Sequence, residues 1–216
     1  MRKIARHRGK LVRDRSKLMN RIKAILRKRG IELDLDLRTK KDRRKLRELE
    51  ISSISDHLEV IETLDDRIER VEKEVEDIGK YMEEVEVLRT IPGIDYNSAL
   101  TIIAEIATIE RFPTSGHLCS YAGLVPSVKQ SGSKELHGSI QGGRSLLRWI
   151  LYQCTFNHVH NSPESHITKF YERLKENKPT KVAMIAATRK LTKVIYWMLK
   201  LKEEFHPEGF DPRNSR

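Results

Sequence analysis

The residues best suited to chemistry lie in the glycine-rich segment that runs from Tyr121 to Arg148. We expect one helix to end near Tyr121 and another to open near Gly143. A serine that attacks a phosphodiester must lie on a rigid turn, with cations around the developing negative charge. The segment supplies a candidate nucleophile, Ser131, and an adjacent glycine, Gly132, that allows a tight turn. It also supplies four candidate phosphate contacts: Lys129, Lys134, Arg144 and Arg148.

Spacing alone does not single out Ser131. Three other serines in the same segment are nearly equivalent by position, and serines in turns are common and mostly inert. His137 is either a proton acceptor for Ser131 or a solvated turn residue. The three competing serines are Ser127, Ser133 and Ser139.

A second group of residues resembles a zinc site, and we predict that it is not one. Among its members only Cys154 and His158 are expected to share a helix face, and no second Cys-x-x-Cys pair supports them. Because Cys119 and Cys154 are the only cysteines, the chain has no disulfide framework, which suits a reducing cytoplasm. The residues considered for zinc are Cys154, His158, His160 and His166.

Charge is distributed unevenly along the 216 residues, whose formal net charge is +11. Residues 1–30 hold thirteen Lys or Arg against one acid, whereas residues 48–86 hold fifteen Asp or Glu against four Lys or Arg. Such a basic segment is typical of contact with nucleic acid. It is also compatible with a solvated face, or with a basic helix lying against the acidic one. The predicted nucleic-acid contacts are Arg6, Arg13, Lys17 and Arg21.

Hydrophobic periodicity predicts a helical first half. Residues 1–29 carry apolar side chains at helical spacing, and a single long helix is expected from about Lys40 to Arg89. From Leu64 to Val85 the apolar residues step by four and three, which is the pattern of a coiled coil. The two helices can pair as an antiparallel hairpin or cross-pair between protomers. We favour dimerisation through this apolar seam.

Pro92 and Gly93 break the long helix, and the residues after them predict a compact helical domain. The sequence Leu88–Ile94 resembles a helix-hairpin-helix, in which a glycine turn approaches a DNA phosphate. A simple helix-breaking turn fits Gly93 equally well, with Asp95 capping the next helix. The expected fold is mainly α, with at most a small β-hairpin around residues 125–140. The expected domains are 1–90, 91–205 and a polar tail, 206–216.

Several of these motifs together resemble a known family. The chain is similar, from about Leu88 to Leu201, to the C-terminal part of the bridge-RNA-guided insertion-sequence transposases, relatives of the pilin-gene inversion recombinases. The motifs that carry the resemblance are Ile91–Ile94, Arg111-Phe112, Tyr121–Pro126, Gln130–Gly132 and Gly142–Arg148.

The resemblance implies a function and partners. It implies that Ser131 forms a covalent phosphoserine link to DNA during transposition, with Arg144 and Arg148 near the scissile strand. It implies DNA and a structured guide RNA as partners. Family members begin with an acidic RuvC-like domain that binds Mg²⁺; we expect this domain to be missing here and no cofactor to bind this chain. The competing hypothesis is a dimeric, catalytically incomplete remnant that binds DNA or RNA.

Overall fold

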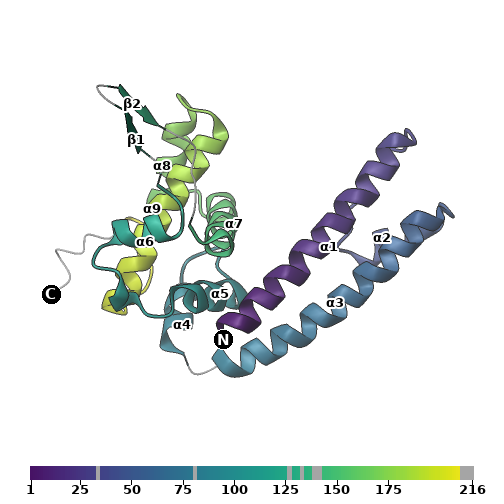
Figure 1. Ribbon diagram of the computed structural model, residues 1–216, viewed down its shortest axis with the longest axis horizontal. Coiled ribbons are helices and arrows are strands. Elements are labelled where there is room, and N and C mark those ends of the chain that lie inside the picture. The colour runs from purple at the N-terminus through teal and green to yellow at the C-terminus, as the bar shows by residue number, and fades with distance from the viewer. Residues whose placement is uncertain (33–34, 80–81, 126–127, 132–133, 138–142, 210–216) are drawn as a thin grey trace. The chain divides into compact units, whose positions relative to one another are not determined.

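The computed structural model describes residues 1–32, 35–79, 82–125, 128–131, 134–137 and 143–209. The chain divides into two compact units, one of residues Lys3–Asp77 and one of residues Ile78–Arg216 with Met1–Arg2. Helices dominate both units, and the described strands form one two-stranded hairpin (Figure 1). The prediction of a mainly α fold with at most a small hairpin is therefore confirmed. Among the described residues, no helix is long and apolar enough to cross a membrane.

The Lys3–Asp77 unit is built on two long helices. Helix α1 (Arg2–Lys28) runs beside α3 (Ser52–Gly79). The short α2 (Lys40–Arg47) lies near the C-terminal end of α1 and the N-terminal end of α3 (Figure 1). Gly30, at φ +69°, ends α1 as its sequence position predicts, because glycine adopts this backbone conformation without strain. The shared core is formed by fully or almost fully buried side chains: Ile22, Leu26, Leu37, Leu46, Ile51, Ile54, Leu58 and Ile61.

The prediction of one helix from Lys40 to Arg89 is wrong. The segment forms α2, α3 and α4 (Glu83–Arg89), and Glu50 takes a left-handed φ of 52° where the chain turns between α2 and α3. The turn lets Leu46 and Ile51, on either side of it, enter the same core. Burial of these two side chains outweighs the helical preference of the charged residues between them.

The apolar seam of α3 packs inside one chain. Ile54, Leu58 and Ile61 join Ile22 and Leu26 of α1 in the core. Further along α3, two more seam positions, at residues 68 and 75, are 4% exposed. The intrachain antiparallel hairpin is therefore the pairing that the structure shows, and dimerisation through this seam stays a prediction.

The second unit is organised around α9 (Thr180–Leu201). Helices α4, α6 (Ser115–Tyr121), α7 (Ser145–Asn161) and α8 (His166–Lys175) all contact α9. Helix α5 (Tyr96–Ile106) packs on α4 and α7, and a 3₁₀ turn, η1 (Ile109–Arg111), follows it. The two strands, β1 (Val128–Ser131) and β2 (Lys134–His137), pair antiparallel between α6 and α7 in the chain.

Candidate functional site

The hairpin segment leaves the helical unit from a closed base, which we call the hairpin root and define as residues 121–125 and 143–144. The backbone N–H of Arg144 donates to the carbonyl oxygen of Tyr121 at 3.0 Å. Gly143 has φ +79°, and a Cβ on it would lie 2.5 Å from the backbone N of Gly123. The two ends of the segment therefore touch, and only glycine allows this approach.

Three arginines gather at the hairpin root. The Nε–H of Arg144 donates to Tyr121 Oη at 3.1 Å, and its guanidinium carbon lies 5.4 Å from the ring centroid. The guanidinium carbon of Arg111 lies 4.8 Å from the same ring. The half-buried Arg148 donates from Nη1 to the carbonyl oxygen of Gly123 at 3.4 Å. This cluster gives the root a positive electrostatic potential, and cation–π contacts hold two of its members in place.

Arg111 and Tyr121 were not among the predicted site residues. Tyr121 Oη donates to the carbonyl oxygen of Glu105 at 3.2 Å, which fixes the ring that the arginines contact. Arg111 is brought to the root by the 3₁₀ turn and donates to the carbonyl oxygen of Ile106 at 3.1 Å. The only sequence signal for a role of these two residues was that they belong to the family-like motifs. Arg111 is 33 residues away from Arg144 in the chain, so spacing did not predict that they lie together.

The structure places the backbone of Ser131 at the end of β1. Ser131 pairs with Lys134, the first residue of β2, and Lys129 pairs with Leu136. Gly132 and the competing serines Ser127, Ser133 and Ser139 lie outside the described residues. Ser131 is thus carried on a hairpin that rises from the arginine-rich root, and the approach of Arg144 and Arg148 to its hydroxyl stays a prediction.

Gly93 lies where the α4–α5 turn packs on α7. Its φ is +91°, and a Cβ would fall 2.6 Å from the backbone N of His158. Asp95 accepts from the backbone N–H of Ser98 at 2.7 Å, so its predicted role as a helix cap is confirmed. Close packing accounts for the glycine, and a phosphate contact at Gly93 stays a prediction.

The residues considered for zinc take part in packing and hydrogen bonds. His158 is fully buried; its Nδ1–H donates to the carbonyl oxygen of Pro92 at 2.8 Å, and its Nε2 accepts from Ser165 Oγ at 2.8 Å. His166 Nδ1 donates to the carbonyl oxygen of Pro207 at 3.1 Å. Burial raises the pKa of the Cys154 thiol to about 12. The described residues contain no group of three or more His, Cys, Asp or Glu arranged for a metal ion.

His158 makes the stability of its unit depend on pH. Burial lowers the pKa of His158 below its usual 6.5, and burial lowers the pKa of His166 in the same direction. The unfolded chain therefore binds protons first, so the stabilisation is complete above about pH 6.5 and is lost as pH falls below it. We expect a slope of at most about 1.4 kcal/mol per pH unit for each histidine.

Urea unfolding followed by tryptophan fluorescence tests this expectation, because Trp149 and Trp197 both lie in the second unit. His158→Gln should flatten the fall in stability between pH 7 and pH 5. His160→Gln, which removes an exposed histidine of the same helix, should leave the slope as it is in the wild type. An unchanged slope in His158→Gln would contradict the assignment.

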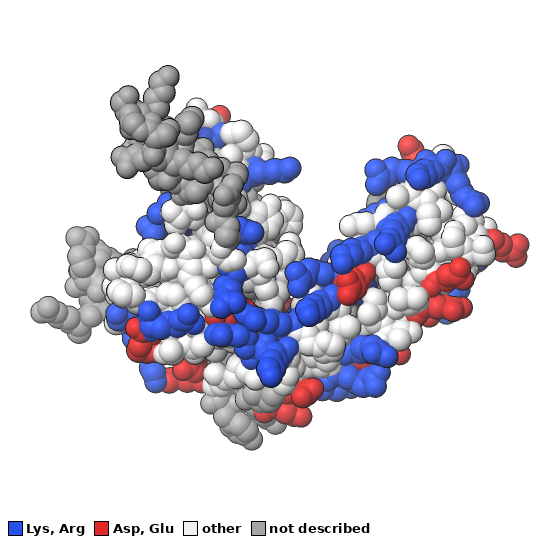
Figure 2. All heavy atoms as spheres, in the orientation of Figure 1, with Lys and Arg blue, Asp and Glu red and all other residues white. Residues whose placement is uncertain are grey.

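The predicted basic helix presents most of its cations on one face. At about 100° per residue, seven cations of α1 fall within an arc of about 80°. All seven are exposed except Arg6, which is half-buried. Figure 2 shows Lys and Arg spheres following α1, whereas the side of α3 turned away from α1 carries acidic spheres together with a separate group of Lys and Arg. We call this set the α1 basic stripe: Lys3, Arg6, Lys10, Arg13, Lys17, Arg21 and Lys28.

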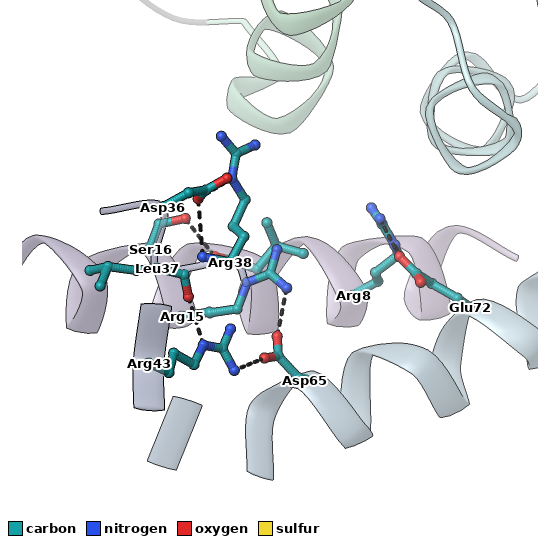
Figure 3. Close-up of polar contacts among 10 residues, drawn as sticks. Arg8, Arg15, Ser16, Asp36, Leu37, Arg38, Arg43, Asp65 and Glu72 are labelled. Atoms are coloured by element: carbon teal, nitrogen blue, oxygen red, sulfur yellow. Dashed lines mark hydrogen bonds and ion pairs between the residues drawn. The ribbon is translucent and has the colours of Figure 1, made fainter. Parts of the chain in front are cut away.

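A different set of arginines on α1 faces α3. Arg8 pairs with Glu72, and Arg15 pairs with Asp65 at 2.6 Å (Figure 3). One hypothesis from the sequence was that the basic helix packs on the acidic one. The ion pairs of Arg8 and Arg15 show this packing. The α1 basic stripe points away from these ion pairs, so packing against α3 does not account for it.

Asp65 is the centre of an ion-pair cluster in this unit. Arg43, whose side chain is 4% exposed, contacts Asp65 at 2.6 Å and donates from Nε to the carbonyl oxygen of Leu37 (Figure 3). Asp65 thus holds two arginines, from α1 and α2. Nothing in the charged run of α2 distinguishes Arg43 from its neighbours, so the sequence did not indicate this cluster.

Comparison with known proteins finds similarity between part of the second unit and a transposase family. Residues 85–172 match the transposase IS116/IS110/IS902 family. The chain is 26% identical, over 92% of its length, to the transposase for insertion sequence element IS1111A of Coxiella burnetii. It is 30% identical over 53% of its length to a 43.6 kDa protein of insertion element IS110 from Streptomyces coelicolor. It is 28% identical over 55% of its length to the pilin gene-inverting protein of Moraxella bovis.

The matched residues, which include the hairpin root, therefore resemble a transposase domain. These residues are similar to the IS116/IS110/IS902 transposase family, and the chain is also similar to the pilin gene-inverting proteins. The chain covers 58% of the length of the Coxiella burnetii relative, 28% of the Streptomyces coelicolor protein and 38% of the Moraxella bovis protein.

Proposed function

We propose that this chain takes part in DNA transposition or site-specific recombination, with Ser131 as the nucleophile. The observation that carries the proposal is the family match over residues 85–172, which spans Ser131 and the arginine-rich root from which its hairpin rises. The root supports it because arginines are suited to stabilise negative charge on a phosphate in the transition state.

The proposed step is an exchange of phosphate esters. Ser131 Oγ attacks a DNA phosphorus, an Oγ–P bond forms, and a P–O bond of the strand breaks. In the net reaction the serine proton passes to the leaving DNA oxygen, so a phosphoserine link and a free DNA hydroxyl result. A second DNA hydroxyl then reverses the exchange and joins a new strand. Arg144 and Arg148 would balance the developing charge.

Nucleic-acid binding by α1 belongs to the same proposal. The α1 basic stripe offers cations at helical spacing to a phosphate backbone. DNA is the proposed substrate, and a structured guide RNA and a second copy of the chain are proposed partners. Magnesium belongs to the proposal as the ion of an acidic domain supplied separately, which is what the family resemblance implies.

A covalent DNA adduct tests the nucleophile. The wild-type chain is mixed with labelled DNA from the flanks of its own gene, and the part of the Coxiella burnetii relative outside the match is added as a second protein. We expect a labelled adduct that resists SDS. Ser131→Ala should reduce its yield by at least about three orders of magnitude, because no other group supplies the attacking oxygen.

The matched controls are the serines that the sequence makes equivalent. Ser127→Ala and Ser139→Ala should keep the adduct, and peptide mapping should find the phosphate on Ser131. An adduct that persists in Ser131→Ala would remove this residue from the mechanism. If DNA binds but no variant or wild-type sample forms an adduct, the second candidate, a non-catalytic nucleic-acid-binding remnant, is favoured.

A further inference from the structure

The pocket between α8 and α9 is not used by the proposed chemistry. Its volume is about 510 Å³, within the usual range for a small-molecule site. The described residues that line it are apolar side chains and three cations, and none of them is a carboxylate. We call it the α8–α9 pocket; the residues used here are Phe170, Val182, Ile185, Arg189, Lys190 and Lys193.

The pocket exists because α9 has a second face. The helix buries one side in the core, whereas Val182 is 50% exposed and Ile185 is half-buried. About two and three turns after Val182, the same face carries Arg189 and Lys193. The outward face is therefore apolar in its first half and cationic in its second half. An occupant that complements it must be flat or apolar at one end and anionic at the other.

Phe170 and Lys190 are held together at the side of the pocket. Lys190 Nζ lies 4.7 Å from the Phe170 ring centroid and donates to the carbonyl oxygen of His166 at 2.9 Å. Phe170 is half-buried, so part of its side chain remains accessible. An aromatic side chain next to fixed cations is the combination with which proteins bind single-stranded nucleic acid, by base stacking and phosphate pairing.

The α8–α9 pocket adjoins the hairpin root. Leu124, which lines the pocket, follows Gly123 in the chain, and Gly123 contacts Gly143 and accepts a hydrogen bond from Arg148. An occupant of the pocket therefore lies next to the base of the hairpin that carries Ser131.

We infer that the α8–α9 pocket binds an unpaired nucleotide of the DNA strand on which Ser131 acts, with the base against Phe170 and Val182 and a phosphate on Arg189 and Lys193. The inference rests on the proposed function for the identity of the strand. It extends that function by assigning a single-stranded DNA site on α8 and α9. A strand opened next to the nucleophile would be held there before exchange.

Photocrosslinking and equilibrium binding together test the site in the full chain. The probe is a fluorescein-labelled oligodeoxynucleotide that carries 5-iododeoxyuridine, with the same sequence supplied as duplex DNA and as RNA. We expect ultraviolet crosslinking of the single-stranded DNA to Phe170, located by mass spectrometry. Phe170→Ala should weaken single-stranded DNA binding by about tenfold, since stacking on one aromatic side chain is lost.

Lys193→Gln tests the cationic half without risk to folding, because Lys193 is exposed. Its plot of log affinity against log salt should become shallower by about 0.7, the value for one phosphate contact with a single strand. Lys181→Gln, an exposed lysine of α9 outside the described lining, and Phe156→Ala, an exposed aromatic of α7, are the matched controls. Both should bind as the wild type does.

Three outcomes would overturn the inference: crosslinks that avoid the pocket, equal losses on duplex DNA, or losses confined to RNA. Unchanged binding in Phe170→Ala and Lys193→Gln would also overturn it and would indicate that the outward face of α9 binds a protein instead. Ser131→Ala should bind the single-stranded probe normally. The two proposals therefore fail separately, because one is read from binding and the other from the covalent adduct.

Discussion

Replacing Asp65 by alanine is expected to lower the free energy of unfolding of the Lys3–Asp77 unit by about 3 kcal/mol. The carboxylate contacts Arg15 and Arg43 at 2.6 Å, and Arg43 is 4% exposed. Its removal would leave a buried guanidinium without a counter-charge. The value lies at the low end for a buried ion pair, because Asp65 itself is 28% exposed and water would compensate in part.

The measurement uses the separate signals of the two units. Both tryptophans lie in the second unit, so helical circular dichroism should show an earlier urea transition while the tryptophan fluorescence transition stays in place. Asp66→Ala removes the neighbouring, exposed carboxylate and should change stability by less than about 0.5 kcal/mol. Equal effects of the two substitutions would show that Asp65 holds no cluster in solution.

Replacing Gly93 by alanine is expected to destabilise the second unit by about 3 kcal/mol. The left-handed φ of +91° is strained for any residue with a Cβ, and that Cβ would lie 2.6 Å from the backbone N of His158. The turn must then move away from α7, which breaks the hydrogen bond between His158 and the Pro92 carbonyl. The shift should appear in the tryptophan fluorescence transition.

Gly30→Ala is the matched control for this substitution. Gly30 has a similar φ of +69°, but a Cβ there meets no atom within 4 Å. Gly30→Ala should lower the free energy of unfolding of the Lys3–Asp77 unit only by the backbone strain, about 1 kcal/mol. Circular dichroism should report this change. If Gly93→Ala costs no more than Gly30→Ala, the close approach to α7 does not stabilise the turn.

Local sequence signals predicted the helical elements better than their connections. The apolar periodicity of α1, the glycine after it and the cap at Asp95 all describe short-range geometry, and the structure confirms each. The break between α2 and α3 was missed. Its cause is the burial of Leu46 and Ile51 in one core, and no local pattern encodes that burial.

The sequence alone determined which side chains are available for chemistry: a basic first helix, a serine in a glycine-bounded segment, lysines on both sides of that serine and arginines after it. Only the tertiary structure decided how they are used. It turned the α3 seam toward α1 of the same chain, assigned Arg8 and Arg15 to ion pairs, and brought Arg111 to Tyr121 beside Arg144. The physical reason is that helix periodicity fixes which residues share a face, whereas the partner of that face is set by contacts between residues far apart in the chain.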